Sequence, residues 1–96
     1  MTNTTLTIRR AAAADAFALN RLAALDSAAP PTGDMLLAEM GNELWAAVAV
    51  ESGVAIADPF RPSGDLVELL RFRAERMRGR EHAHRGALAR LLPRAA

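Results

Sequence analysis

The run ELWAAVAV, residues 43–50, constrains the fold most because it is apolar on both faces of a pleated strand. Side chains alternate between the two faces of a strand. One face therefore receives Leu44, Ala46, Val48 and Val50, and the other receives Trp45, Ala47 and Ala49. Such a strand needs apolar cover on both sides, which helices provide in many sheets. We expect this run inside a sheet that carries a helix on each face.

Three further strands are predicted around this run. Residues 35–40 and 54–58 are short apolar runs on either side of it in the sequence. The links between the three runs, Gly41-Asn42 and residues 51–53, have the length and composition of hairpin turns. The run TLTIR near the N-terminus alternates apolar and polar residues, as a half-buried strand does.

Two helices are predicted. Residues 11–26 have helical periodicity, and one face gathers Ala16, Leu19, Leu22 and Ala23. Asp15 near the start of this helix suits the helix dipole. The loop that follows, residues 27–34, holds paired prolines and a glycine.

The second helix is predicted to start after Ser63, a natural N-cap, with Asp65 in its first turn. Its apolar stripe is made of Leu66, Leu70 and Met77, flanked by Leu69 and Ala74. Arg73 falls inside this stripe, so we expect it to be shielded or paired, whereas Phe72 falls on the polar side. Gly79 is expected to end the helix.

The order strand, helix, loop, three-strand meander, helix predicts an α+β fold. Its sheet has four mostly antiparallel strands, with helices on its faces. We expect one half-domain over residues 1–79 and an arginine-rich tail over residues 80–96, with room for a short helix before Pro93.

Composition excludes several classes of protein. A chain of 96 residues supports one small domain, and 22 alanines leave its core with little large apolar volume. No disulfide or thiolate metal site is available without cysteine. We find no signal peptide and no apolar run of about 20 residues, so we expect a cytoplasmic protein without membrane contact.

This order of elements resembles the first half of the GNAT-type, acetyl-CoA-dependent N-acyltransferase fold. The resemblance covers about residues 5–79. The opening strand and helix carry it through Ile8, Arg9, Ala11 and Asp15, and the strands around Gly41 and the stretch from the last strand into the second helix extend it. The family fold continues with further strands beyond those predicted here, so the resemblance implies a truncated, degenerate half-domain.

The resemblance also implies a vestigial pyrophosphate loop at Arg61, Ser63 and Gly64. The family loop reads Gln/Arg-x-x-Gly-x-Gly/Ala, and its backbone N–H groups hold the coenzyme A pyrophosphate. Arg61 and Gly64 match its first and fourth positions. The other positions depart from it: Pro62 removes an N–H donor, and Asp65 and Leu66 disfavour the approach of a phosphate. We therefore expect no bound cofactor, with acetyl-CoA or coenzyme A as the alternative.

No catalytic residue or metal site is predicted. The chain has no tyrosine, the residue that often serves as general acid in the family's missing half. His82 and His84 lie in the charged tail without an apparent nucleophile, and two histidines with Glu81 make a weak metal signal.

Three functions stay open at this point. The first is a non-catalytic GNAT-like half-domain that acts as a homodimer or binds a protein partner, through the edge strand 54–58 or the helix 65–78. The second is an N-acetyltransferase completed by a second chain. The third is an anion or nucleic-acid binder, because residues 61–96 hold nine arginines and four acidic residues, a net charge of +5. Interleaved glutamates and scarce aromatic residues argue against nucleic acid.

Overall fold

The computed structural model describes residues 5–91, and the side chains of residues 5–80. Its elements, in chain order, are β1 (Leu6–Arg10), the 3-10 turn η1 (Ala13–Asp15), α1 (Ala16–Leu25), β2 (Met35–Met40), β3 (Glu43–Ala49), β4 (Ala55–Ala57) and α2 (Gly64–Leu91).

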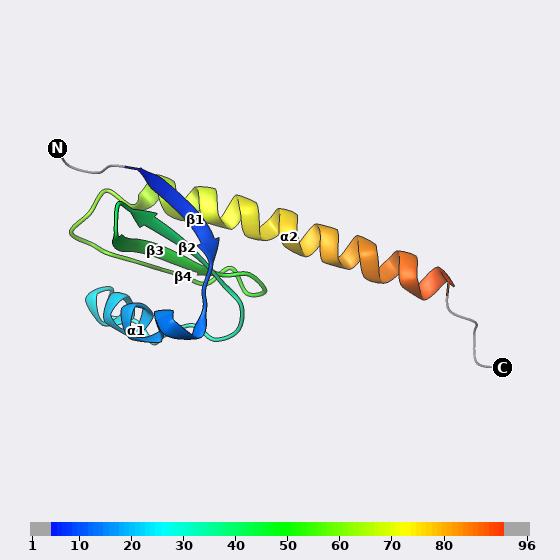
Figure 1. Ribbon diagram of the computed structural model, residues 1–96, viewed down its shortest axis with the longest axis horizontal. Helices are drawn as coiled ribbons and strands as arrows, with labels where there is room; N and C mark the ends of the chain where they lie inside the picture. The colour runs from blue at the N-terminus through cyan, green and yellow to red at the C-terminus, as the bar shows by residue number, and fades with distance from the viewer. Residues whose placement is uncertain (1–4, 92–96) are drawn as a thin grey trace.

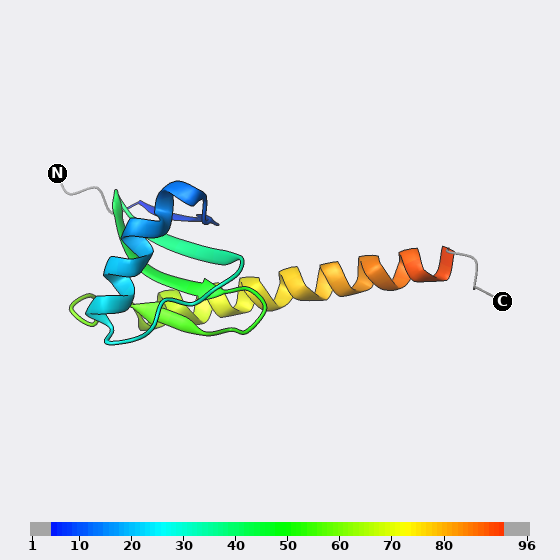
Figure 2. The same ribbon diagram turned by 90° about the horizontal axis from the view of Figure 1, so that it is seen from below.

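The four strands form one antiparallel sheet in the order β1-β2-β3-β4. Helix α1 lies on one face of the sheet and α2 on the other (Figure 1). Seen from below, α1 crosses the sheet in front of the strands, and α2 continues well past their ends (Figure 2). The predicted α+β fold with helices on both faces is confirmed.

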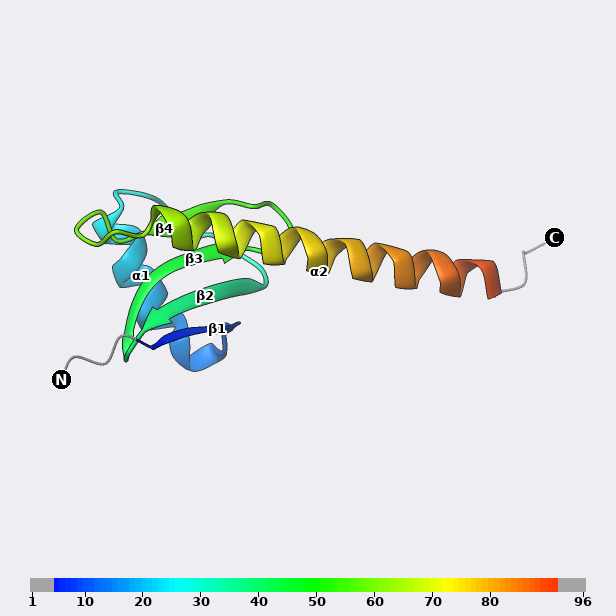
Figure 3. The ribbon, with the colours of Figure 1, turned by 90° about the horizontal axis from the view of Figure 1, so that it is seen from above.

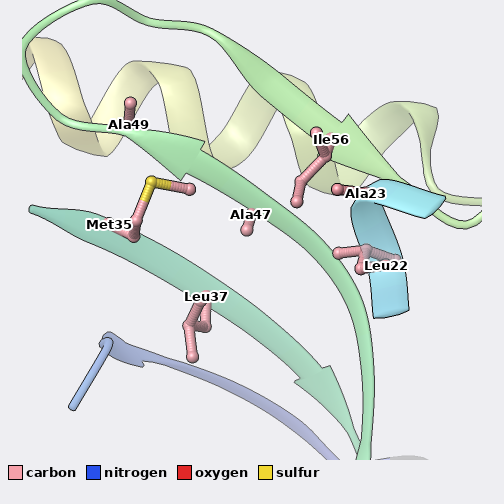
Figure 4. Packing of buried hydrophobic residues seen from close by; sticks show 7 residues of the cluster. All are labelled: Leu22, Ala23, Met35, Leu37, Ala47, Ala49 and Ile56. Carbon is pink, nitrogen blue, oxygen red and sulfur yellow. The ribbon is translucent and has the colours of Figure 1, made fainter. Parts of the chain in front are cut away.

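The face under α1 is packed mainly by strands β2 and β3. Leu22 and Ala23 of α1 are buried there, and Ile56 of β4 closes the cluster at one side. Figure 4 shows these side chains with their partners in the sheet, Met35, Leu37, Ala47 and Ala49. The small alanines of β3 allow α1 to lie close to the sheet.

The face under α2 has its own apolar cluster. Leu70 and Ala74 are buried against strands β2 and β3, and Leu66, Val67 and Met77 pack at the borders. The strands contribute Leu36, Ala38, Ala46, Val48 and Val50. The second helix thus uses the stripe predicted for it.

A β-bulge changes the faces of β3 at its start. Ala38 pairs with Ala46, but the next residue of β2, Glu39, pairs with Leu44, which leaves Trp45 as an extra residue. Such an extra residue shifts the alternation of side chains by one position. Leu44 consequently packs with the cluster under α1 rather than beside Ala46. The prediction that Leu44 and Ala46 share a face is wrong for this reason.

Both predicted hairpin turns contain a glycine with positive φ. Gly41 has φ of 63° between β2 and β3, and Gly53 has φ of 74° between β3 and β4. Side chains disfavour this conformation, so glycine suits both turns.

Gly79 does not end α2, which runs without interruption to Leu91. Glycine costs about 1 kcal/mol in a helix interior, and its neighbours here, mostly arginine, glutamate and alanine, favour the helix. The expected division between residues 1–79 and 80–96 therefore falls within one continuous helix.

The expectation that Arg73 is shielded or paired is also wrong. Its side chain is exposed, and it takes part in none of the hydrogen bonds or ion pairs between described residues. The apolar cluster under α2 lies mostly over β2, β3 and β4. Arg73 stands on the flank of α2 that faces β1, where the sheet has no helix above it (Figure 3).

Candidate functional site

The turn before α2 contains the three residues predicted from the pyrophosphate loop. Ser63 is 7% exposed, and its hydroxyl donates to the backbone carbonyl of Asp58 at 3.2 Å. The carbonyl of Ser63 accepts the N–H of Val67 at 3.0 Å, the first hydrogen bond of the helix. Ser63 therefore occupies the N-cap position, but its hydroxyl ties the turn to the end of β4.

Arg61 points away from the start of α2 and toward the beginning of β3. Its guanidinium donates to Glu43 at 2.8 Å and lies 5.3 Å from the ring centroid of Trp45. The indole N–H of Trp45 donates to the same Glu43 oxygen at 3.3 Å. These contacts hold the Arg61 charge against a carboxylate.

Gly64 is exposed at the first position of α2, and a Cβ atom added there would meet nothing within 4 Å. It lies next to Ser63 in the chain, whereas the Arg61 side chain is paired with Glu43 at the start of β3. Arg61 forms an ion pair with Glu43, and Ser63 anchors the turn to Asp58. Gly64 is exposed at the first position of α2.

The outer edge of β4 is short and partly closed. The N–H of Ala49 bonds to Val54 and the N–H of Asp58 bonds to Trp45, so the backbone groups of Ala55 and Ala57 face away from β3. The Asp26 carboxylate accepts the outward N–H of Ala57 at 3.1 Å. Of the two outward N–H groups of β4, that of Ala55 is available to hydrogen-bond another strand.

A groove of about 500 Å³ lies between β1 and α2. Seen from above, α2 runs along the β3–β4 side of the sheet and leaves β1 uncovered (Figure 3). Apolar side chains from β1, β2 and α2 line the groove: Ile8, Leu36, Leu69, Phe72 and Met77. A surface hollow of this size and character is typical of a binding site.

The remaining lining residues among residues 5–80, whose side chains the structure describes, are the arginines Arg9, Arg10, Arg73, Arg76 and Arg80. No acidic side chain of this part of the chain lines the groove. Among the described side chains, Arg73, Arg76 and Arg80 make no ion pair, although Arg76 lies 5.7 Å from the ring centroid of the half-exposed Phe72. The groove therefore combines an apolar floor with a cationic rim, in which Arg73, Arg76 and Arg80 pair with no described carboxylate.

The charge of Arg9 is neutralised by two carboxylates. Two of its nitrogens donate to the Asp15 carboxylate, each at 2.8 Å, and its Nε donates to Glu39. Asp15 also accepts the backbone N–H of Ala12 at 2.6 Å. The Arg9 contact and this N–H hold the pKa of Asp15 well below its usual range, and the two carboxylates raise the pKa of Arg9. This network fixes the end of β1 to η1 and β2.

No three His, Asp or Glu side chains in the described part of the chain lie close enough together to hold a metal ion. The side chains of His82 and His84 lie outside that part. Neither described helix has both the length and the apolar character needed to cross a bilayer.

Comparison with protein-family models, with curated proteins and with solved structures finds no match to this chain. The function of this chain is therefore inferred from its residues and their geometry.

Sequence reasoning treated the arginines of α2 as one set and missed the groove. Arg73, Arg76 and Arg80 are spaced by three and four residues and share one flank of the helix. Glu68 and Glu75 fall on the opposite flank. A helical wheel that separated the two signs of charge would have found this asymmetry, but the approach of β1 to that flank follows only from the sheet.

Proposed function

We propose that this chain is a non-catalytic, GNAT-like half-domain that binds a negatively charged partner in the groove between β1 and α2. The observation that carries the proposal is the cationic rim of the groove, where Arg73, Arg76 and Arg80 face no carboxylate of the described side chains. The sheet order and the helix on each face support the half-domain.

The chemistry of the groove favours binding over catalysis. Arginine stays protonated in proteins, so it orients an anion but does not shuttle protons near neutral pH. Within residues 5–80, the groove lining includes no histidine, serine or acidic side chain that would serve as base or nucleophile.

Glutamates interleave with the arginines of α2 in the sequence, and this argues against binding of an anion or a nucleic acid by the helix. In the fold, Arg71 and Arg78 on the opposite flank donate to the carbonyls of Gly53 and Glu51. None of the hydrogen bonds or ion pairs between described residues joins Glu68 or Glu75 to a groove arginine. The groove side of α2 thus keeps its positive charge available.

The helix 65–78 is better suited to association than the edge strand 54–58. Strand β4 spans three residues, Asp26 closes one of its two outward N–H groups, and Pro59 follows shortly after. Two copies joined through β4 would gain few hydrogen bonds. Phe72, 55% exposed, and the groove arginines lie on α2 instead.

Binding of a fluorescent poly-L-glutamate at low salt tests the proposal. We expect wild-type protein to bind it, Arg73→Glu to weaken binding about fivefold or more, and Arg21→Glu, an equal charge change on α1, to leave binding nearly unchanged. Equal losses in both variants, or no binding by the wild type, would show that the groove is not an anion site.

A further inference from the structure

We propose that the groove receives one amphipathic α-helix from an acidic protein partner, laid beside α2 over β1. This inference rests on the proposed anion-binding function and adds the shape and the chemistry of the occupant.

The sheet is wider than the helix that covers this face. Four strands spaced about 4.8 Å apart span roughly 14 Å between the outer strand axes. A helix with its side chains is about 10 Å across, so α2 covers about two-thirds of this face. The β2 side chains Leu36 and Ala38 are already buried under α2. Packed helices lie about 8–10 Å apart, which places a second helix beside α2 above β1. Figure 3 shows β1 without a helix above it.

The length and the lining of the groove also fit a helix. Its α2 wall runs from Leu69 to Arg80, eleven residue steps that rise about 16 Å. Three turns of a partner helix match this length. Ile8, Leu36 and Met77 lie on the floor between the two walls, where an apolar stripe on the partner would be buried.

Positive charge lies along the α2 side of the floor. Arg73, Arg76 and Arg80 lie on this side and make no ion pair among the described side chains. A helix seated on the floor would meet their guanidinium groups along one flank of its apolar stripe. Glutamates or aspartates on that flank give charge-assisted, bidentate pairs with arginine. The occupant is therefore acidic as well as amphipathic.

A second copy of this chain does not have that chemistry. Helix α1, Ala16–Leu25, contains no acidic residue. Residues 64–80 of α2 hold three acidic residues, but their apolar stripe is already packed on the sheet of the same chain. Residues 81–91 of α2 hold one glutamate against two arginines. The segments 1–4 and 92–96, outside the described residues, contain no acidic residue either. The partner is thus a different protein.

Nucleic acid fits the groove less well than an acidic helix. Single strands are held by several aromatic side chains on which bases stack, and Phe72 is the one aromatic residue lining this groove. A phosphate backbone also offers no apolar surface that could pack on the floor of the groove. The experiment must therefore distinguish binding of nucleic acid from binding of an acidic helix.

The test compares three labelled probes by fluorescence anisotropy with the full chain. The first is a synthetic peptide of about 14 residues with leucines at i, i+3, i+4 and i+7 and glutamates on both flanks, the second is a scrambled peptide of the same composition, and the third is an oligothymidylate. We expect the amphipathic peptide to bind about tenfold more tightly than the other two probes, and to gain helical circular dichroism when it binds.

Two double variants locate the binding. Arg73→Ala with Arg76→Ala should weaken peptide binding about tenfold. Arg21→Ala with Arg71→Ala, which removes the same charge outside the groove, should change it less than about twofold. All four substituted side chains are exposed, so both variants should keep the fold.

The outcomes separate this inference from the proposed function. Equal affinity for the amphipathic and scrambled peptides would overturn the helical occupant and leave anion binding standing. Preference for the oligothymidylate would overturn it in favour of nucleic acid. No binding of any probe would overturn both proposals, and equal losses in the two double variants would place the binding outside the groove.

Discussion

Leu70→Ala should be the most destabilising single truncation in α2. Leu70 is fully buried, and it lies in the cluster that holds α2 on strands β2 and β3. Three of the neighbouring side chains are already small, namely Ala38, Ala46 and Ala74. The gap left by the substitution would therefore stay largely open, which places the loss near the upper part of the usual range for leucine, about 3–4 kcal/mol.

That loss is large relative to the whole domain. A chain of 96 residues is expected to have a stability of roughly 5–14 kcal/mol, and its alanine-rich core favours the lower end. A loss of about 3 kcal/mol would lower the Tm by about 12–24 °C. Urea unfolding followed by circular dichroism at equilibrium measures the change in free energy directly.

Leu69→Ala is the matched control, because it makes the same substitution one residue earlier in the same helix. Leu69 is half-buried beside the groove, so its truncation should cost about 1 kcal/mol. Equal losses at the two positions, or a loss below about 1 kcal/mol for Leu70→Ala, would show that α2 does not rest on the sheet through Leu70.

Three further predictions concern Gly79 within α2, the ion pair between Arg9 and Asp15, and the turn before α2. Gly79→Ala should stabilise the protein by about 0.5–1 kcal/mol and raise its helical signal, because Gly79 lies within a continuous helix with open space around it; a loss of stability in urea unfolding would contradict this. Because Arg9 lowers the pKa of Asp15 in the folded protein, their pair should stabilise the fold above the usual aspartate pKa of about 3.9, and that stability should be lost as pH falls below it. Asp15→Asn should therefore lower the Tm by more at pH 7 than at pH 2, whereas an equal difference at both pH values would exclude the ion pair as its cause. Coenzyme A and acetyl-CoA should give no binding heat in calorimetry, because Arg61 is paired with Glu43; micromolar affinity that Gly64→Arg abolishes would instead support the acyltransferase hypothesis.

The sheet could be predicted from sequence because its signals are local. The two-faced run of β3 requires a helix on each side, and the glycines at residues 41 and 53 favour hairpin turns that fix the strand order. The bulge at Trp45 could not be predicted in this way. It depends on how β2 and β3 pair, and it moves Leu44 to the opposite face.

The two errors in α2 have different physical causes. Gly79 was expected to stop the helix, but a single glycine costs less than its helix-forming neighbours contribute together. Arg73 was expected in the core because a wheel describes one helix without the width of the surface beneath it. The sheet leaves the β1 side of α2 open, so Arg73 stays in solvent and lines the groove. The candidate site thus follows from the placement of β1 beside α2, which no local pattern indicates.

Nuclear magnetic resonance with ¹⁵N-labelled protein and the unlabelled acidic amphipathic peptide tests the central claim most directly, because it shows where the peptide binds. We expect the largest amide shifts in two segments that are far apart in sequence and face each other across the groove, residues 6–10 and 69–80. Residues 16–25 of α1, on the opposite face of the sheet, should change little. Shifts concentrated in α1 or in the turn at residues 58–64, or no shifts at saturating peptide, would contradict the assignment of the groove as the binding site.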